Sequence, residues 1–211
     1  MKRNRSDEKS RRVPSGAAVP RAELTEALYR AFFEEWADRG FAALSLERVA
    51  ARAGAGKAAI YRRFSSRLAF AEAAISTLGL RIALPEVEGT TLQEDILNLL
   101  IQNRVVLRHP LVRRILPDLH AEAARSTEMR AINDQVAQAR RERAEALLNR
   151  WVRRGELPED LDRDLALDLL VAPLYWRMVV RGKTPTYAEL ETQSRAIIAG
   201  LTAIGMTVMS H

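Results

Sequence analysis

Hydrophobic side chains recur along most of the chain at the three- and four-residue spacing of a helix, and the strict alternation typical of strands is missing. The first apolar stripe consists of Leu24, Leu28, Ala31, Phe32 and Trp36. These positions share one face of a helix, and Gly40 is expected to end it because glycine suits the left-handed conformation found after a helix C-terminus. The pattern therefore predicts an all-α chain whose first helix buries aromatic side chains.

Two short helices are predicted to follow directly. Ser45 precedes residues 46–51 as an N-cap, and Gly54 stops this second helix. A third helix is expected over residues 57–64. The connection at residues 53–56 contains two glycines, which supply the positive φ that a tight turn needs. Two short helices joined in this way are typical of a DNA-binding helix-turn-helix, or of a solvated helical corner in another all-α protein.

The third predicted helix has an apolar inward face and an outward face of small, aromatic and basic side chains. Ile60 and Phe64 point inward, toward Phe32 and Trp36. The outward and flanking positions are Lys57, Ala58, Ala59, Tyr61 and Arg62. Alanines permit close approach to base edges, the cations can donate to guanine or phosphate, and the tyrosine hydroxyl can reach a phosphate. This face is the predicted DNA-reading surface.

Longer helices are predicted beyond residue 65. Apolar periodicity and helix-breaking residues place them at residues 66–83, 91–108, 127–154 and 162–181. Between the second and third of these, Pro110 restarts the chain and Pro117 falls inside a shorter segment, which is expected to be a kinked helix. With a last apolar segment near the C-terminus, the chain should contain about nine helices.

The last two helices are more apolar than a surface requires. One stripe consists of Leu165, Leu169, Ala172, Trp176 and Val180, and the other of Leu190, Ile197, Leu201, Ile204 and Val208. Two such helices from each of two subunits would close into a four-helix bundle, with Ala196 and Gly200 permitting close approach. The same stripes can instead pack inside one protomer, and their spacing alone favours neither arrangement.

The positive charge of the chain is concentrated at its beginning. The 211 residues carry a net charge of +6; residues 1–67 hold 15 Lys and Arg against 8 Asp and Glu, whereas residues 68–211 hold 18 against 19. A basic end joined to a nearly neutral body suits a protein whose front faces phosphates. Residues 1–20 are interpreted as a disordered basic arm, which either follows DNA or only maintains solubility.

Composition and motif content argue against several other classes. The chain has no cysteine, which excludes disulfides and thiolate metal sites, and its N-terminus never develops the apolar stretch of a secretory signal. We expect a cytoplasmic protein that is not embedded in a membrane. A nucleophile with its base, a carboxylate pair in a defined setting and a phosphate-cradling glycine loop are all missing, which argues against an enzyme. Isolated histidines predict no metal site, and no cofactor is expected.

Residues 40–68 carry a motif with many fixed positions. It comprises Gly40-Phe41, Ser45, Val49-Ala50 and the run Ala53-Gly54-Ala55-Gly56-Lys57-Ala58-Ala59-Ile60-Tyr61-Arg62-Arg63-Phe64-Ser65-Ser66-Arg67-Leu68. This motif resembles the signature of the TetR family of regulators, in a pattern that spans roughly residues 24–70. Gly56 stands where the family usually has serine, Ala59 where threonine is common and Arg67 where lysine is common. Individual base contacts therefore cannot be carried over.

The resemblance implies a homodimer in two parts, a three-helix helix-turn-helix DNA-binding domain at residues 21–67 and a helical ligand-binding and dimerisation domain at residues 68–211. It places Ser45 and Arg48 against the DNA backbone and Arg67 on a phosphate. The recognition helix and its start would supply Gly56, Lys57, Ala58, Ala59, Tyr61 and Arg62. The expected interface residues are Leu169, Trp176, Leu190, Ile197, Leu201 and Ile204.

In this family the fourth to seventh helices enclose an effector cavity. The corresponding lining expected here is Leu78, Leu100, Asn103, Leu107, Leu116, His120, Ile132 and Val136. Asn103 and His120 would orient a ligand in a mostly apolar site, although a histidine on a helix is more often a satisfied or partly exposed residue than a ligand contact.

The resemblance thus implies a ligand-responsive transcriptional regulator whose partners are double-stranded operator DNA, a second copy of the chain and a small-molecule effector. Repression is the commoner mode in the family, with release from a palindromic operator when the effector binds. The alternatives are an effector-free DNA-binding or architectural protein and an activator. A solidly packed body would favour the effector-free alternative.

Overall fold

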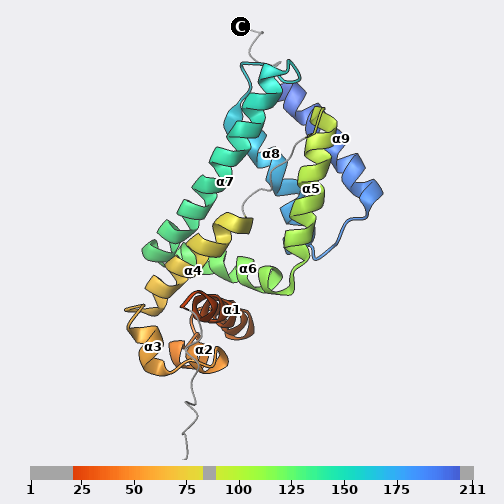
Figure 1. Ribbon diagram of the computed structural model, residues 1–211. Helices are drawn as coiled ribbons and strands as arrows, with labels where there is room; N and C mark the ends of the chain where they lie inside the picture. The colour runs from red at the N-terminus through yellow and green to blue at the C-terminus, as the bar shows by residue number, and fades with distance from the viewer. Residues whose placement is uncertain (1–20, 83–88, 205–211) are drawn as a thin grey trace, which may run out of the picture.

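The protein is all-α in the part of the chain that the computed structural model describes, residues 21–82 and 89–204, with the side chains of residues 21, 22 and 78–82 excepted. The helices are α1 (Arg21–Arg39), α2 (Leu46–Arg52), α3 (Lys57–Tyr61), α4 (Arg67–Ile82), α5 (Leu92–Arg108), α6 (Pro110–Arg125), α7 (Thr127–Arg153), α8 (Arg163–Tyr175) and α9 (Tyr187–Ile204). The first three lie at one end of an elongated molecule and α9 near the other, with α4 and the long α7 between them (Figure 1). The predicted arm at residues 1–20 lies outside the described residues.

The helix-turn-helix forms where the sequence predicted it. Gly40 and Gly54 adopt φ values of +76° and +66°, which end α1 and open the turn after α2. Ser45 caps α2 by accepting from the Arg48 amide at 3.4 Å. The third helix is shorter than predicted because the Arg63 and Phe64 amides both donate to the Ile60 carbonyl, which closes the helix in a tighter turn.

The first hydrophobic core joins the helix-turn-helix to the body. Phe32 is fully buried at its centre, with its ring centroid 4.7 Å from that of Phe70 on α4 and 5.7 Å from that of Trp36. From the body, the buried contributors to this core are Ile115, Leu119, Ala123, Met129, Ile132 and Val136. The domain boundary drawn between residues 67 and 68 remains a prediction, and the core of α1–α4 extends across it into α6 and α7.

A single carboxylate of α6 holds the corner after α1. Asp118 Oδ2 accepts from the Trp36 indole Nε1 at 2.6 Å and from the Phe41 amide at 2.8 Å. A weaker contact lies beside it, because Arg114 of α6 is 3.5 Å from Asp38 of α1 and both side chains are largely exposed. Since α6 also packs on α7, the position of this helix determines where the corner sits.

A second core fills the far end of the body between α5, α7, α8 and α9. Its polar centre is the fully buried Asp95, which accepts from the Trp151 indole at 2.8 Å and from the Gly89 amide at 2.7 Å. Arg150 of α7 and Arg154, which caps the end of that helix, approach the same carboxylate at 2.9 and 3.1 Å. A buried charge needs such partners, so Asp95 ties the start of α5 firmly to the end of α7.

The helix before the last one differs from expectation. The helix predicted over residues 162–181 is α-helical only as far as Tyr175, and residues Trp176–Val180 form a π-turn in which the Arg181 amide donates to the Trp176 carbonyl at 2.9 Å. Pro117 lies inside α6 without ending it. Among the described residues, no helix combines the length and apolarity that crossing a bilayer requires.

Replacing Asp118 with Ala should lower the free energy of unfolding by about 1 to 3 kcal/mol, because the Trp36 indole and the Phe41 amide lose their acceptor. Urea unfolding followed by tryptophan fluorescence measures the change. Arg114→Ala, on the same helix but with an exposed ion pair, is the matched control and should cost less than about 1 kcal/mol. Equal stabilities of the Asp118 and Arg114 variants would contradict the role given to Asp118.

Candidate DNA-binding surface and ligand cavity

The outward face of α3 is arranged as its periodicity predicted. Ile60 is completely buried against the first core, whereas Lys57, Ala58, Tyr61 and Arg62 are exposed. Ala59 lies at the flank and is half-buried, and Gly56 caps the helix without a side-chain hydrogen bond. This places a short helix with small and basic side chains at the free end of the molecule, where nothing in the described chain covers it.

An acidic residue that the sequence interpretation did not include sits in the middle of this surface. Glu47 of α2 lies 2.9 Å from the Lys57 ammonium and accepts from the Tyr61 hydroxyl at 2.8 Å and from the Ser45 hydroxyl at 2.9 Å. The hydrogen bond from Lys57, followed by the one from Tyr61, lowers the pKa of Glu47 to about 2, so the carboxylate is ionised at neutral pH. It also raises the pKa of Lys57 and of Tyr61.

Two of the arginines expected on the DNA backbone are engaged within the protein. The Arg48 guanidinium donates to the buried Glu35 at 2.5 Å and to the Ala43 carbonyl at 2.6 Å. Arg67 donates to the Ala42 carbonyl at 2.6 Å and stacks 4.8 Å from the Phe41 ring centroid. Both side chains therefore hold the connection between α1 and α2.

Arg62 differs from these arginines. It is exposed on the outward face of α3, and in the part of the chain that the structure describes its side chain has no ion pair or hydrogen bond. Lys57 is likewise exposed but is paired with Glu47. Arg62 can therefore bind DNA without first breaking a contact within the described protein.

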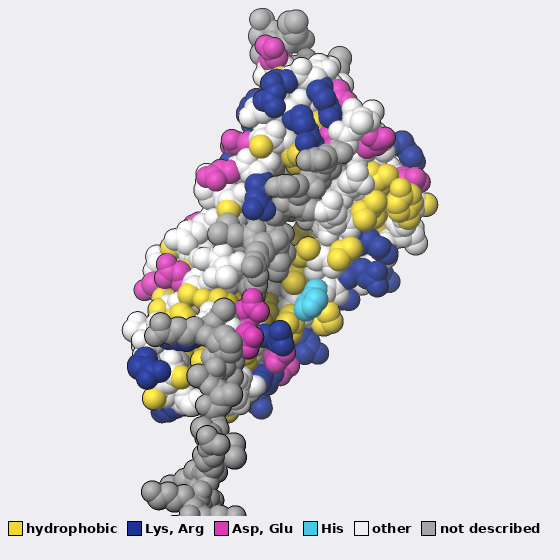
Figure 2. Space-filling view, in the orientation of Figure 1, with side chains coloured by type: hydrophobic (Ala, Val, Ile, Leu, Met, Phe, Trp, Pro, Cys, Tyr) yellow, Lys and Arg dark blue, Asp and Glu magenta, His cyan; other side chains and the backbone are white. Residues whose placement is uncertain are grey.

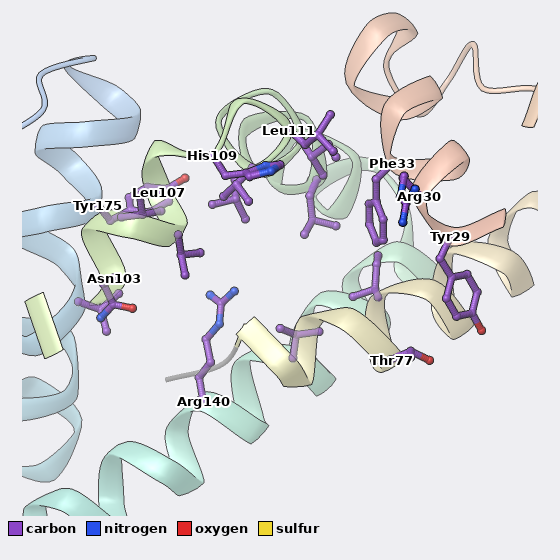
Figure 3. Close-up of a pocket in the computed structure, with 18 of the residues that line it drawn as sticks. Tyr29, Arg30, Phe33, Thr77, Asn103, Leu107, His109, Leu111, Arg140 and Tyr175 are labelled. Atoms are coloured by element: carbon purple, nitrogen blue, oxygen red, sulfur yellow. The ribbon is translucent and has the colours of Figure 1, made fainter. Parts of the chain in front are cut away.

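A cavity of about 750 Å³ lies between the helix-turn-helix and the body. Its wall is mostly apolar and comes from α1, α4, α5, α6, α7 and α8 (Figure 3). Helix α1 contributes Thr25, Glu26, Tyr29, Arg30 and Phe33, so the DNA-binding half forms one side of the cavity directly. Helix α6 contributes Leu111, Val112, Ile115, Leu116 and Leu119. The body is therefore not solidly packed at this junction.

The predicted lining is correct in part. Asn103, Leu107, Leu116 and Val136 line the cavity. Leu100 and Ile132 do not, because they are buried in the second and first cores. His120 is not a lining residue either; it is exposed, and its ring packs on that of Tyr175 with centroids 5.8 Å apart. Leu78 falls among the side chains that the structure does not describe.

Sequence reasoning missed Arg140, Tyr175, His109 and the α1 residues of the wall. A signal for Arg140 was available, since residues 132, 136 and 140 follow the four-residue spacing of one α7 face. The contribution of α1 had no such signal, because which helix closes the cavity depends on tertiary packing. No group of three or more potential metal-ligating side chains occurs among the described residues.

Most of the residues predicted for the dimer interface pack within the protomer. Leu190, Ile197 and Leu201 are buried in its second core. Gly200 also serves the protomer, because a β-carbon there would lie 3.1 Å from Leu169 on α8. Ile204 and Leu169 pack partly against the same core. The stripe of α9 therefore faces inward, as the alternative of packing within one protomer required.

Other apolar side chains remain exposed on α8, the π-turn and the start of α9. Besides Val171, which lines the cavity, they are Leu165, Trp176, Val180 and Tyr187, with Trp176 58% exposed. Hydrophobic side chains gather over α9 in the space-filling view (Figure 2). Of the residues predicted for the interface, Trp176 belongs to this exposed face.

Two family models match the chain in the places that this geometry suggests. Residues 27–74 match the model described as bacterial regulatory proteins, tetR family, and residues 88–197 match the tetracyclin repressor-like C-terminal domain, which alone covers more than half of the chain. The chain belongs to the TetR family. It is a helix-turn-helix transcriptional regulator of that family, and the resemblance noted in the motif of residues 40–68 is confirmed.

Relatives of this TetR-family protein agree in length and fold. The HTH-type transcriptional regulator YdeS of Bacillus subtilis (strain 168) is 26% identical over 167 residues, which cover 77% of this chain and 82% of YdeS. Salmonella enterica GusR superposes with a TM-score of 0.74 at 20% identity, over 89% of this chain and all of GusR. A TetR transcription regulator from Haloarcula marismortui gives 0.68 at 19% identity, over 87% and 98%. These two structures show that the fold is shared.

Replacing Glu47 with Gln should raise the affinity for any DNA duplex, because a carboxylate leaves the phosphate-facing surface and Lys57 is released from its ion pair. One additional phosphate contact would make the plot of log affinity against log salt steeper by about 0.9. Fluorescence anisotropy with a non-specific duplex at several salt concentrations measures both quantities.

The matched control is Glu34→Gln, which removes an exposed ion pair with Arg52 elsewhere in the DNA-binding half. Its affinity and salt dependence should stay close to those of the wild type. Weaker binding by the Glu47 variant would show instead that the carboxylate positions Lys57 and Tyr61 for DNA.

Proposed function

We propose that this TetR-family protein is a homodimeric repressor, released from a pseudo-palindromic operator when a small molecule fills the cavity. The observation that carries the proposal is the place of the cavity, between α1 of the helix-turn-helix and α5–α8 of the body. A cavity of about 750 Å³ lies within the range of sites that take drug-sized molecules. An effector-free architectural protein would have no use for such a space.

The DNA contacts proposed here follow the exposed face of α3. Arg62 and Lys57 supply base-edge or mixed contacts, Tyr61 reaches a phosphate, and Ala58 and Ala59 allow close approach. Ser45 and Gly56 contribute at the starts of α2 and α3, where free backbone amides face the phosphates. Arg48 and Arg67 act mainly by holding the α1–α2 connection, with their remaining guanidinium donors available to the backbone.

Dimerisation is proposed through the exposed apolar face that contains Leu165, Trp176, Val180 and Tyr187. Exposed aromatic and aliphatic side chains on elements that contact each other mark an interaction surface, and two-fold symmetry makes the same surface available on both copies. A two-fold dimer would present two α3 helices to successive major grooves, about one helical turn of DNA apart. Operator binding then depends on the spacing between the two helices.

Coupling between cavity and DNA is proposed through α1 and α6. Ile115, Leu116 and Leu119 of α6 line the cavity, while Asp118 of the same helix holds Trp36 and Phe41 at the corner after α1. A ligand that displaces α6 or presses on Phe33 would therefore move the helix-turn-helix relative to the body. Coupling of about 1 to 3 kcal/mol would weaken operator binding roughly 5- to 150-fold. Repression is proposed over activation as the commoner mode of the family.

The proposal is tested by linkage between the two ligands. An operator is first obtained by selection from randomised duplexes, and it should be a pseudo-palindrome whose half-sites lie about one helical turn apart. Compounds that raise the Tm are then measured by calorimetry with and without saturating operator. Operator should weaken effector binding by the same factor by which effector weakens operator binding. Identical affinities in both conditions for every compound would contradict ligand-gated release.

Replacing Trp176 with Ala should raise the dimer dissociation constant about 30-fold or more, because a central exposed Trp on the proposed interface is the kind of residue that contributes about 2 kcal/mol or more. Analytical ultracentrifugation measures the constant. Val105→Ala, which truncates an exposed side chain on α5, is the control and should leave it unchanged. Equal dissociation constants for wild type and the Trp176 variant would place the interface elsewhere.

A further inference from the structure

Arg140 is a charged residue in a mostly apolar wall. Its side chain extends from α7 toward the middle of the cavity, with Asn103 and Tyr175 toward one side and the α1 residues toward the other (Figure 3). The other charged lining residues, Glu26 and Arg30, are exposed on α1. Within the described residues Arg140 has neither a hydrogen bond nor an ion pair. Its neighbour Arg141, which does not line the cavity, pairs with Asp164 and Glu145.

An unpaired cation in this position is unfavourable for the free protein. Loss of water on burial lowers the pKa of Arg140, yet an arginine is not deprotonated at neutral pH, so the charge remains. Tyr175 does not neutralise it, because burial raises the pKa of the phenol and keeps it protonated. The Arg140 side chain is half-buried in the cavity wall, and a charge withdrawn from water normally has a partner of opposite sign. Here the described protein supplies none.

We infer that the cavity takes an apolar molecule bearing a carboxylate, which pairs with the Arg140 guanidinium. The planar fork of the guanidinium matches two carboxylate oxygens, and the apolar wall accepts the rest of the molecule. The Asn103 amide and the Tyr175 hydroxyl, both on the cavity wall to one side of Arg140, are further donors to a bound anion (Figure 3). A neutral compound would leave Arg140 unpaired, and a protonated amine would be repelled by the guanidinium. The inference rests on the proposed function in taking the cavity to be the effector site.

Calorimetry with matched probes tests the ligand class. The probes are aliphatic and aromatic carboxylates of graded length, each with its primary amide and its primary amine, used below their micelle concentrations. At least one carboxylate should bind the wild-type protein about ten-fold or more tighter than its amide, and the amine should bind least. Carboxylates that bind no better than their amides across the whole set would overturn the inference.

Variants assign the preference to Arg140. Arg140→Gln should weaken carboxylate binding about 10- to 100-fold while leaving the amide unchanged, because only the charged ligand loses its partner. Arg141→Gln, one residue along α7, is the matched control and should keep the full preference. Arg140→Met should have an unchanged or higher Tm without ligand, because an unpaired cation is removed. A marked fall in Tm, or a carboxylate preference that survives in Arg140→Gln, would contradict the assignment.

Operator binding, measured on the same samples, separates this inference from the proposed function. A carboxylate that binds through Arg140 and leaves operator affinity unchanged would support the site and contradict ligand-gated release. A neutral compound that releases operator, with no carboxylate preference in any pair, would overturn the inference and leave the proposed function intact.

Discussion

The pair of hydrogen bonds that Asp118 accepts from Trp36 and Phe41 connects the cavity wall to the helix-turn-helix. Helix α6 uses one face to line the cavity and Asp118 to hold the corner between α1 and α2. The corner in turn positions α3, because α2 and α3 pack behind it on the same core. A closely packed core cannot deform gradually, so a displaced α6 must carry the helix-turn-helix with it or break these bonds.

Several cations of the DNA-facing end already have partners within the protein, so fewer are free to bind phosphates than the composition suggests. Arg48, Arg52 and Arg67 are bonded to acidic side chains or backbone carbonyls of the same end, and Lys57 is paired with Glu47. The contacts of the three arginines hold the reading surface in place before DNA arrives, which lowers the entropy that binding must overcome, whereas Lys57 must give up Glu47 to contact DNA. They also leave Arg62 as the cation on α3 that does not have to give up an internal partner.

Local pattern predicted the fold well. Capping residues, glycines at turns and apolar stripes located the helices within a few residues, and the inward position of Ile60 followed from periodicity alone. The features that were not predicted are those that depend on which helices contact each other. Periodicity cannot say whether the stripe of Leu190, Ile197 and Leu201 faces its own core or a second subunit, and here it faces the core. The pairing of Glu47 with Lys57 and Tyr61 is also a contact between two helices, so periodicity does not predict it. The two partners lie 10 and 14 residues further along the chain, on α3.

The sequence predicted a mostly apolar cavity but only some of the residues that line it. Positions on α5, α6 and α7 followed from their helical faces, whereas His120 is exposed outside the cavity and Arg140, which lines it, was not predicted. Recognising an arginine as unpaired requires knowing every neighbour in space. The α1 side of the wall likewise appears only in the assembled structure, and it would bring any molecule in the cavity into direct contact with the DNA-binding half.

The relative position of the two helix-turn-helix units can be measured directly. Because the chain has no cysteine, Ala51→Cys attaches one spin label to the exposed face of α2 in each protomer. Double electron–electron resonance then gives the label separation for the free dimer, with saturating effector and with operator. Filling the cavity should shift the separation by several ångströms away from the operator-bound value, and Asp118→Ala should reduce that shift. An identical separation with effector and with operator would contradict the account.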